Sequence, residues 1–265
     1  MTLSFKKYQG TGNDFVMLDA MKGQDYSALT REKIERLCDR RFGIGADGLI
    51  ILTKSDHVDF RMVYYNSDGN QSTMCGNGAR CIVRFAYDLG LITNEELKTI
   101  FEAIDGLHVA YVLENNVISL KMNDVGSFKN LGNEAYELNT GSPHYVKIID
   151  EIPTDVKKEG SAIRYNDDYT KEGINVNFVV VSNQNVLQMA TYERGVEDET
   201  YSCGTGVVAA AVSYSLFNIL TEPTMLAVVT KGGNLAVKLN PNPSGATDIW
   251  LIAEAKMVFE GEIEV

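Results

Sequence analysis

Residues 74–81 of the sequence read Met74-Cys75-Gly76-Asn77-Gly78-Ala79-Arg80-Cys81, and residues 202–206 echo them as Ser202-Cys203-Gly204-Thr205-Gly206. Each stretch places a cysteine directly before a Gly-x-Gly turn that opens into a long apolar segment. After the first stretch, apolar residues recur at helical spacing up to Gly90, where a helix would end. After the second, residues 207–220 are apolar on nearly every side. Both stretches therefore predict a helix that carries a cysteine at its N-terminus.

A cysteine in this position can be chemically active. The first N–H groups of a helix have no partner within the helix, attract anions and lower the pKa of a thiol. A single such motif is more often a buried cysteine beside an ordinary turn. Two copies, one in each half of the chain, favour a duplicated unit with a shared site that has two thiols and a cradle for a carboxylate.

The composition limits the classes of partner. The chain has 265 residues, of which 45% are hydrophobic and 23% charged, enough for one large domain or two smaller ones. The net charge of −12 argues against nucleic acid or an anionic membrane as a partner. It does not exclude an anionic small-molecule substrate, because local N–H groups and one arginine can outweigh a diffuse field.

The sequence carries no signal for export or for membrane insertion. Residues 1–8 lack the apolar core of a signal peptide. The longest uncharged segment, residues 200–221, is interrupted by glycine, serine and asparagine, and its apolar part is shorter than the ~20 residues that span a bilayer. We therefore expect a cytoplasmic protein in which this segment forms a buried central helix.

Cysteine and glycine spacing argues against three other kinds of site. The four cysteines, Cys38, Cys75, Cys81 and Cys203, do not predict a disulfide framework in an intracellular chain, and we interpret Cys38 and Cys81 as core residues. The sequence has no Cys-x-x-Cys and its three histidines are scattered, so no metal site is expected. The glycine-rich residues 40–48 resemble a dinucleotide fingerprint only loosely, since no strand precedes them and no helix follows.

The rest of the chain is rich in predicted strands. Thr30 is expected to cap a helix over residues 31–39. Strands are expected at residues 5–8, 15–18, 49–53, 59–66, 108–113 and 117–122, within 135–146, and at 174–182, 188–192, 226–229, 235–239, 249–253 and 256–265. Parallel strand–helix–strand alternation is not expected. The predicted fold is α+β, with two pseudo-symmetric halves that divide near Asn123, each a mixed sheet or barrel wrapped around its own apolar helix.

Six motifs follow one another along the chain: Gly-Thr-Gly-Asn-Asp-Phe (10–15), Asn-Ser-Asp-Gly (66–69), Met-Cys-Gly-Asn-Gly-Ala-Arg (74–80), Gly-Ser-Pro-His (141–144), Glu-Arg-Gly (193–195) and Ser-Cys-Gly-Thr-Gly (202–206). Together they resemble the diaminopimelate epimerase family, isomerases that interconvert LL- and meso-2,6-diaminopimelate without a cofactor in lysine and cell-wall precursor biosynthesis. The resemblance implies an N-terminal half of residues 1–122 with a returning strand at 257–265, and a C-terminal half of residues 123–256. It is compatible with a homodimer.

Inversion of an alpha carbon explains why two thiols are needed. One proton leaves one face of the carbon and another arrives at the opposite face, so one group acts as a base and a second as an acid. A thiol with a pKa near 8.5 can serve in either form around neutral pH. Backbone N–H groups at the helix ends would stabilise the negative charge that develops at the carboxylate.

The resemblance also implies roles for individual residues. Cys75 and Cys203 are the acid/base pair, and His144 and Glu193 tune their protonation. Gly76-Asn77 and Gly204-Thr205 form the carboxylate cradle, and Arg194 pairs with the distal carboxylate. The implied substrate-binding residues are Asn13, Asn66, Gly76, Asn77, Asn175, Glu193, Arg194, Gly204 and Thr205. The resemblance implies neither a metal nor a cofactor.

Three positions depart from the family pattern. Gly48 stands where many relatives have glutamine, Ser142 where many have asparagine, and Asn177 where many have glycine. The first two positions leave the distal end of the substrate pocket less defined than the chemistry.

Three other functions fit part of the pattern. One is a cofactor-free racemase or epimerase for a different amino acid; proline racemases look similar, but usually carry histidine in place of Asn77. A second is a thiol redox protein in which Cys75 and Cys203 cycle as a disulfide, although no Cys-x-x-Cys is present. A third is a non-catalytic amino-acid binding module, which would not need both cysteines.

Overall fold

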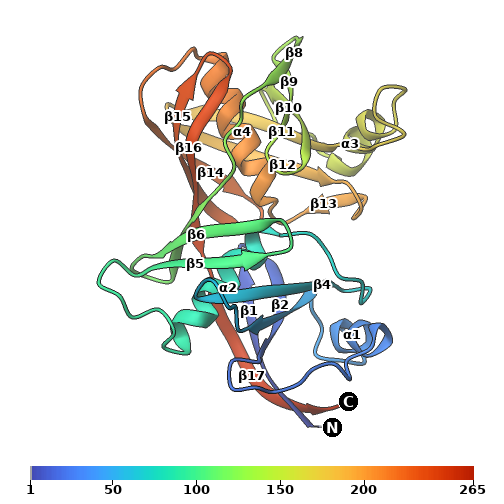
Figure 1. Cartoon of the computed structure of the whole chain (residues 1–265). Helices are drawn as coiled ribbons and strands as arrows, with labels where there is room; N and C mark the ends of the chain where they lie inside the picture. The colour runs from blue at the N-terminus through green and yellow to red at the C-terminus, as the bar shows by residue number, and fades with distance from the viewer. Residues whose placement is uncertain (1) are drawn as a thin grey trace. The chain divides into compact units, whose positions relative to one another are not determined.

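The computed structural model describes residues 2–265 and divides into two compact units (Figure 1). Unit 1 consists of the described residues up to Leu120 together with Ala253–Val265, and unit 2 consists of Lys121–Ile252. The chain therefore leaves unit 1 once and returns to it at the end.

Unit 1 is built from antiparallel hairpins and two parallel strand pairs. Strand pairs β1–β2, β3–β4, β5–β6 and β6–β7 are antiparallel, whereas β2–β3 and β4–β5 are parallel. The last strand, β17, pairs with β1 along nearly its whole length. The elements are β1 (Thr2–Gly10), β2 (Asn13–Asp19), α1 (Arg31–Cys38), β3 (Gly48–Thr53), β4 (Phe60–Asn66), α2 (Gly76–Asp88), β5 (Lys98–Ala103), β6 (Gly106–Val112), β7 (Val117–Lys121) and β17 (Lys256–Glu264).

Unit 2 repeats this arrangement. Strand pairs β8–β9, β9–β10, β11–β12 and β14–β15 are antiparallel, whereas β10–β11 and β12–β14 are parallel. The elements are β8 (Phe128–Gly132), β9 (Ala135–Asn139), β10 (Pro143–Ile149), α3 (Val156–Arg164), β11 (Asn175–Asn183), β12 (Val186–Glu193), β13 (Asp198–Thr200), α4 (Gly204–Phe217), β14 (Thr224–Thr230), β15 (Gly233–Asn242) and β16 (Gly245–Glu254).

The expected absence of parallel strand–helix–strand alternation is wrong. Each helix lies between two strands that pair in parallel: α1 between β2 and β3, α2 between β4 and β5, α3 between β10 and β11, and α4 between β12 and β14. A parallel pair needs such a crossover, because its strands must start at the same edge of the sheet. Local sequence patterns indicate strands but do not reveal which strands pair, so this feature was missed. The α+β class with two similar halves is confirmed.

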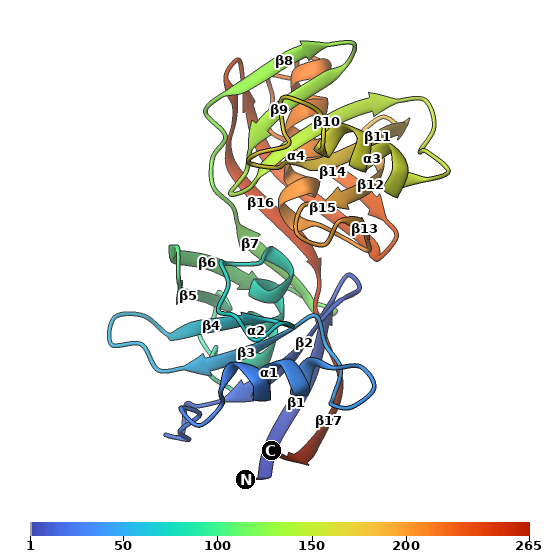
Figure 2. The ribbon, with the colours of Figure 1, turned by 90° about the vertical axis from the view of Figure 1, so that its right-hand side faces the viewer.

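Each cysteine-bearing helix is enclosed by the strands of its own unit (Figures 1 and 2). Helix α2 packs against β1, β2, β3, β4, β6 and β17, and α4 packs against β9, β10, β11, β12, β14 and β15. Every residue of α4 from Gly206 to Ser215 is buried, as expected for a helix that is apolar on all sides. Within residues 2–265, no helix is long and apolar enough to cross a membrane.

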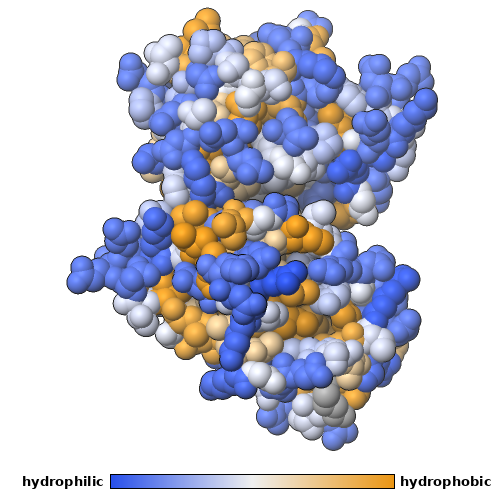
Figure 3. Space-filling view, viewed as in Figure 1, coloured by the Kyte–Doolittle hydropathy of each residue, from blue (hydrophilic) through white to orange (hydrophobic). Residues whose placement is uncertain are grey.

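Four elements were not predicted from the sequence: helix α3 and strands β5, β8 and β13. Helix α3 begins after Asp155, whose carboxylate accepts a hydrogen bond from the Lys158 N–H at 2.9 Å. Strand β5 continues through a turn into β6, and Figure 3 shows apolar side chains at the surface over these two strands. Ile104 and Leu107 near this turn are 56% and 64% exposed. The predicted helix over residues 31–39 is confirmed as α1, with Thr30 as its N-cap.

Candidate active site

The two cysteines occupy the same position in their helices. Cys75 is the N-cap of α2, and its carbonyl accepts a hydrogen bond from the Ala79 N–H at 2.7 Å. Cys203 is the N-cap of α4, and its carbonyl accepts from the Val207 N–H at 2.9 Å. Neither thiol caps its own helix. The first N–H groups of both helices are therefore not capped by the cysteine side chain.

A chain of oriented side chains surrounds Cys75. The Nη2 of Arg80 donates to Asn77 Oδ1 (2.9 Å), Asn77 Nδ2 donates to Asn13 Oδ1 (3.3 Å), and Asn13 Nδ2 donates to Asp47 Oδ2 (2.7 Å). A guanidinium can only donate and a carboxylate can only accept, so the two ends fix the orientation of both amides. The Cys75 thiol donates to Asn13 Oδ1 at 3.5 Å. We call these five residues the Cys75 cluster.

Arg80 is a buried cation in this cluster. Its side chain has no exposed surface, and it also donates to the Gly76 carbonyl (3.2 Å) and to Thr11 Oγ1 (3.0 Å). Its Nε has no hydrogen-bond partner, and no carboxylate among residues 2–265 forms an ion pair with it. Burial lowers the pKa of Arg80, whereas negative charge at Cys81 or Cys75 would raise it. A guanidinium stays protonated in proteins, so the cation attracts negative charge toward these sulfurs.

Cys38 and Cys81 are core residues, as predicted. Cys81 is fully buried, and burial raises its pKa far above neutral, which outweighs the attraction of Arg80. Burial likewise raises the pKa of Cys38 to about 12. Both side chains are therefore neutral thiols at physiological pH. Cys75 is the more exposed thiol beside Arg80.

A row of uncharged side chains starts at Cys203. Its sulfur lies 3.5 Å from Thr205 Oγ1, and Thr205 Oγ1 lies 2.9 Å from His144 Nε2. The other ring nitrogen, Nδ1, lies 3.0 Å from Asn177 Nδ2. His144 belongs to β10 and is fully buried, so it does not lie in a surface turn. Burial and the positive charge of Arg194 lower the pKa of His144 to about 3. We call Cys203, Thr205, His144 and Asn177 the Cys203 cluster.

Three of the implied substrate-binding residues lie in two places, Asn66 in unit 1 and Asn175 with Arg194 in unit 2. Asn66 ends β4, opposite Gly48 of β3. Asn175 lies in β11, where its Nδ2 donates to Ser142 Oγ (2.7 Å) and to the Pro143 carbonyl (3.0 Å). Its Oδ1 accepts from the Arg194 N–H at 3.0 Å, so Asn175 holds the backbone of the turn that follows Glu193. Ser142 therefore takes part in placing Arg194.

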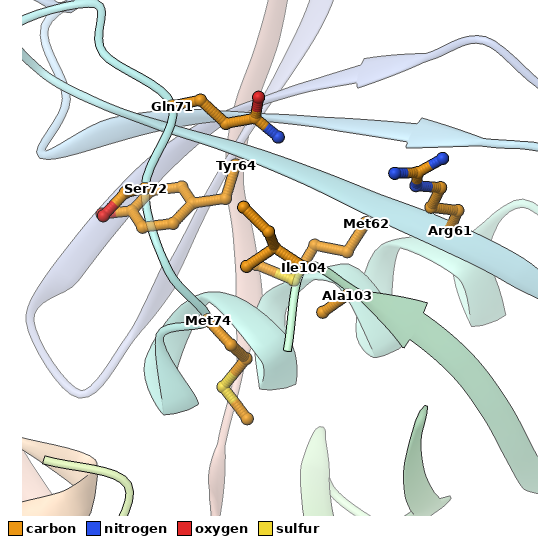
Figure 4. Close-up of a pocket in the computed structure, with 8 residues that line it drawn as sticks. All are labelled: Arg61, Met62, Tyr64, Gln71, Ser72, Met74, Ala103 and Ile104. Atoms are coloured by element: carbon orange, nitrogen blue, oxygen red, sulfur yellow. The ribbon is translucent and has the colours of Figure 1, made fainter. Parts of the chain in front are cut away.

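Tyr64 fills the space beside Gly48. A Cβ atom on Gly48 would lie 2.5 Å from the Tyr65 carbonyl oxygen and 2.6 Å from the Tyr64 ring. The Tyr64 ring packs edge-on against Phe15, with ring centroids 5.8 Å apart. Tyr64 also lines a small pocket whose wall continues to Met74, the residue before Cys75 (Figure 4). A side chain at position 48 would therefore clash with the Tyr64 ring and the Tyr65 backbone.

Three residues of the two clusters were not expected as site residues. Arg80 ends the motif at residues 74–80, and its place in α2, which also carries Arg84, gives no sign that it is buried beside Cys75. Asp47 lies in the glycine-rich loop before β3, where the sequence pattern gave no sign of a contact with Asn13. Asn177 was noted as a departure from the family pattern, without a role. Their positions depend on tertiary contacts that sequence spacing does not reveal.

Comparisons with known proteins agree with this picture. The family model described as diaminopimelate epimerase matches residues 5–118 and 136–249, one segment in each unit. A diaminopimelate epimerase of Flavobacterium psychrophilum is 50% identical over 97% of this chain and 98% of its own length. One of Chlorobaculum tepidum is 40% identical over 96% of this chain and 98% of its own.

Solved structures share the fold at low sequence identity. A phenazine biosynthesis protein of the PhzF family from Bacillus anthracis has a TM-score of 0.77 at 15% identity, covering 100% of both chains. A hydroxyproline epimerase from Agrobacterium vitis has a TM-score of 0.67 at 11% identity, covering 99% of this chain and 92% of its own. These two likenesses concern the fold alone.

Proposed function

We propose a function from one premise: this chain belongs to the diaminopimelate epimerase family. It is accordingly an isomerase, an amino-acid epimerase, and its reaction is the interconversion of LL- and meso-2,6-diaminopimelate in lysine biosynthesis. We propose that the reaction proceeds by two-thiol acid/base catalysis without a cofactor.

The observation that carries the mechanism is the matched placement of the two thiols. Cys75 and Cys203 are both N-caps of enclosed helices, and neither side chain is used to cap its helix. We assign one cysteine as the thiolate that removes the alpha proton, and the other as the thiol that returns a proton to the opposite face. The reaction runs in both directions, so each cysteine takes either role.

The charge that develops on the substrate carboxylate needs stabilisation. We assign this role to the first-turn N–H groups of α2 and α4, at Gly76-Asn77 and Gly204-Thr205. Such donors are fixed by the helix before the substrate arrives, so they need no rearrangement during the reaction. Removal of one comparable donor in other enzymes costs about 10²–10³-fold in rate.

The remaining assigned residues bind the substrate or tune the thiols. Arg194 pairs with the distal carboxylate, and Glu193 lies by the substrate ammonium. Asn13, Asn66 and Asn175 hold the substrate in place, Asn175 acting in part through the Arg194 backbone. His144 and Glu193 tune the protonation of the cysteines, His144 through Thr205.

We further propose the setting in which the enzyme works. Its partner is the small-molecule substrate rather than nucleic acid or a membrane, it acts in the cytoplasm, and it assembles as a homodimer. Its two domains are residues 1–122 with 257–265, and residues 123–256.

A direct assay tests the reaction. The purified protein, with reductant and without added cofactor, should convert LL-diaminopimelate to an equilibrium mixture with the meso form. The same assay with single-centre amino acids, including proline, tests the alternative of a different racemase. This control is needed because the Tyr64 ring lies beside Gly48, one of the positions that depart from the family pattern. Conversion of another amino acid in preference to LL-diaminopimelate would overturn the proposed substrate.

A further inference from the structure

Asn177 is a buried side chain with every polar atom engaged. It lies in β11 and has no exposed surface. Its Nδ2 donates to the Tyr145 carbonyl (3.0 Å) and lies 3.0 Å from His144 Nδ1, while its Oδ1 accepts from Thr191 Oγ1 (3.0 Å). A Cβ atom on Gly206 would lie only 2.5 Å from Asn177 Oδ1, so the amide sits directly against the first turn of α4.

These contacts determine the orientation of the Asn177 amide. The Tyr145 carbonyl can only accept, so the amide atom that faces it must be the NH₂ group. The same NH₂ group then has one N–H left for His144 Nδ1. Nδ1 must accept this bond, because a protonated Nδ1 would place two donors against each other.

The orientation of Asn177 in turn determines the tautomer of His144. Since the imidazole is neutral and Nδ1 accepts, the ring proton lies on Nε2. Nε2–H donates to Thr205 Oγ1 at 2.9 Å. The Thr205 hydroxyl proton is then directed to its other neighbour, the Cys203 sulfur at 3.5 Å. A hydrogen bond donated to a sulfur favours its thiolate form.

We propose that Asn177 is a positioning residue that holds His144 as the Nε2–H tautomer, so that Thr205 donates a hydrogen bond to Cys203 and favours its thiolate. The inference rests on the proposed function, in which Cys203 is an acid/base group. It gives His144 a specific part in that function: a fixed neutral donor that carries no proton to or from the substrate.

The surroundings of α4 are consistent with a hydrogen-bond relay. The helix itself has no charged residue. The charged residues on the strands packed against it are Glu137 of β9, Lys147 of β10, Glu193 of β12 and Lys238 of β15, and Arg194 directly follows β12. Glu137 pairs with Lys129, and Arg194 acts on His144 in the same direction as burial. Burial and the charge of Arg194 thus both keep the imidazole of His144 neutral.

The first test reads the tautomer directly. Nitrogen-15 NMR of histidine-labelled protein distinguishes Nε2–H from Nδ1–H in a neutral imidazole, and the His144→Gln variant identifies the signal. We expect Nε2–H, with no titration between pH 5 and pH 8. The Asn177→Asp variant offers Nδ1 an acceptor instead of a donor and should move the proton to Nδ1. A native Nδ1–H tautomer would overturn the proposal.

The second test reads the effect on the thiol. The pH midpoint of iodoacetamide alkylation is measured for each cysteine by peptide mass spectrometry. Thr205→Val, which keeps the shape of threonine without the hydroxyl, should raise the Cys203 midpoint by about one pH unit. Thr205→Ser should restore it. The Cys75 midpoint in the same samples should not change, because Cys75 lies in unit 1 and Thr205 in unit 2.

A double variant separates the relay from a simple charge effect. Asn177→Asp should also raise the Cys203 midpoint, and combining it with Thr205→Val should add little if the two act through one path. Full additivity would contradict the relay. Asn183→Asp, a new charge at the exposed end of the same strand, should leave the midpoint unchanged. If Asn177→Asp does not fold, the tautomer of the native protein and the Cys203 midpoints of Thr205→Val and Thr205→Ser still test the proposal. None of these readouts needs substrate. A failed epimerase assay would therefore contradict the proposed reaction without contradicting the relay.

Discussion

The N-termini of α2 and α4 share a backbone arrangement but differ in the side chains around their cysteines. In the Cys75 cluster, a buried cation at Arg80 and a carboxylate at Asp47 end a chain of two amides. In the Cys203 cluster every member apart from the thiol is neutral, and Val208 stands where α2 has Arg80. The duplicated helices thus keep the geometry that a thiol needs, while the means of tuning it has diverged.

The difference concerns how each thiol is influenced. A buried charge acts through space and favours thiolate at Cys75, although Asn13 Oδ1 accepts from this thiol and opposes the effect. The proposed relay would act on Cys203 through hydrogen bonds. In the proposed two-thiol mechanism each cysteine both gives and takes a proton, and two different surroundings would allow the pKa of each thiol to be adjusted alone.

The largest expected effect comes from removing either thiol. Cys75→Ala and Cys203→Ala should each lower epimerisation by at least about 10²–10⁴-fold in both directions, because one face of the carbon loses its proton carrier. The remaining thiol should still exchange the alpha hydrogen with D₂O on its own face. Inversion and deuterium uptake are followed from LL and from meso substrate. Cys81→Ala should keep the reaction and lose stability, and near wild-type inversion by either alanine variant of the pair would contradict the mechanism.

The second glycine of each motif offers a matched pair of variants. A Cβ on Gly206 would meet the pinned Asn177 amide at 2.5 Å, whereas a Cβ on Gly78 would meet the end of the Ile50 side chain at 3.0 Å. Gly206→Ala should therefore lower the free energy of unfolding by about 2–3 kcal/mol, and Gly78→Ala by about 1 kcal/mol. Urea unfolding of both variants measures the difference. Equal losses of unfolding free energy in the two variants would show that the Asn177 amide moves aside as easily as the apolar side chains around Gly78.

Mild acid should weaken unit 2 before unit 1. The folded-state pKa of His144 is about 3, below the unfolded value of 6.5, so the unfolded state binds more protons and stability falls as the pH drops below 6.5. At pH 5 the loss is about 2 kcal/mol. Burial raises the pKa of Asp14 in unit 1, but hydrogen bonds from Arg40 and Lys7 outweigh it and bring the value to about 2. The stability that Asp14 contributes is therefore lost only below pH 3.8.

Amide hydrogen exchange locates this acid effect. Exchange is compared at pH 7 and pH 5, corrected for the intrinsic rate, in peptides from each unit. His144→Gln should remove the extra acid sensitivity of unit 2. Unit 1 peptides that open first would refute the assignment of the weakness to His144.

The smallest expected effect concerns Arg80. Arg80→Gln keeps a hydrogen-bonding side chain but removes the charge, and should raise the alkylation midpoint of Cys75 by about one pH unit. Arg80→Lys should keep most of the native midpoint. Arg84→Met, one turn along the same helix where the arginine pairs with Asp88, is the matched control and should change nothing. If the Cys75 midpoint does not change in Arg80→Gln, the Arg80 charge does not influence this thiol, and the inferred difference between the two clusters is wrong.

Much of the fold followed from local patterns in the sequence. The enclosed helix after Cys203 was predictable because no surface helix is apolar on all sides. Helix α3 was missed because it is short and carries Gly160 at a position where a Cβ would lie 2.3 Å from the Tyr192 Cβ, so tertiary packing rather than propensity explains that glycine. The parallel crossovers were missed because pairing direction depends on residues far apart in the chain.

The site residues, like the elements of the fold, include some that the sequence could predict and others that depend on tertiary contacts. Motif resemblance led to Cys75, Cys203 and the residues next to them in sequence. The structure brings Thr205 and His144 together within unit 2, and Asn13 and Asn77 together within unit 1. Arg80, Asp47 and Asn177 act through hydrogen bonds to residues distant in sequence. A buried polar side chain of this kind is defined by what it contacts, and one sequence does not contain that information.

The return of β17 to β1 has a consequence for synthesis on the ribosome. Strand β1 pairs with β2 on one side and with β17 on the other, and β17 emerges only after the whole of unit 2. Domains usually complete folding in the order in which they are made. Here the order is reversed: unit 2 can finish first, while β1 waits with an unpaired edge that invites association with other nascent chains. The first strand to be translated is thus among the last to complete its strand pairing.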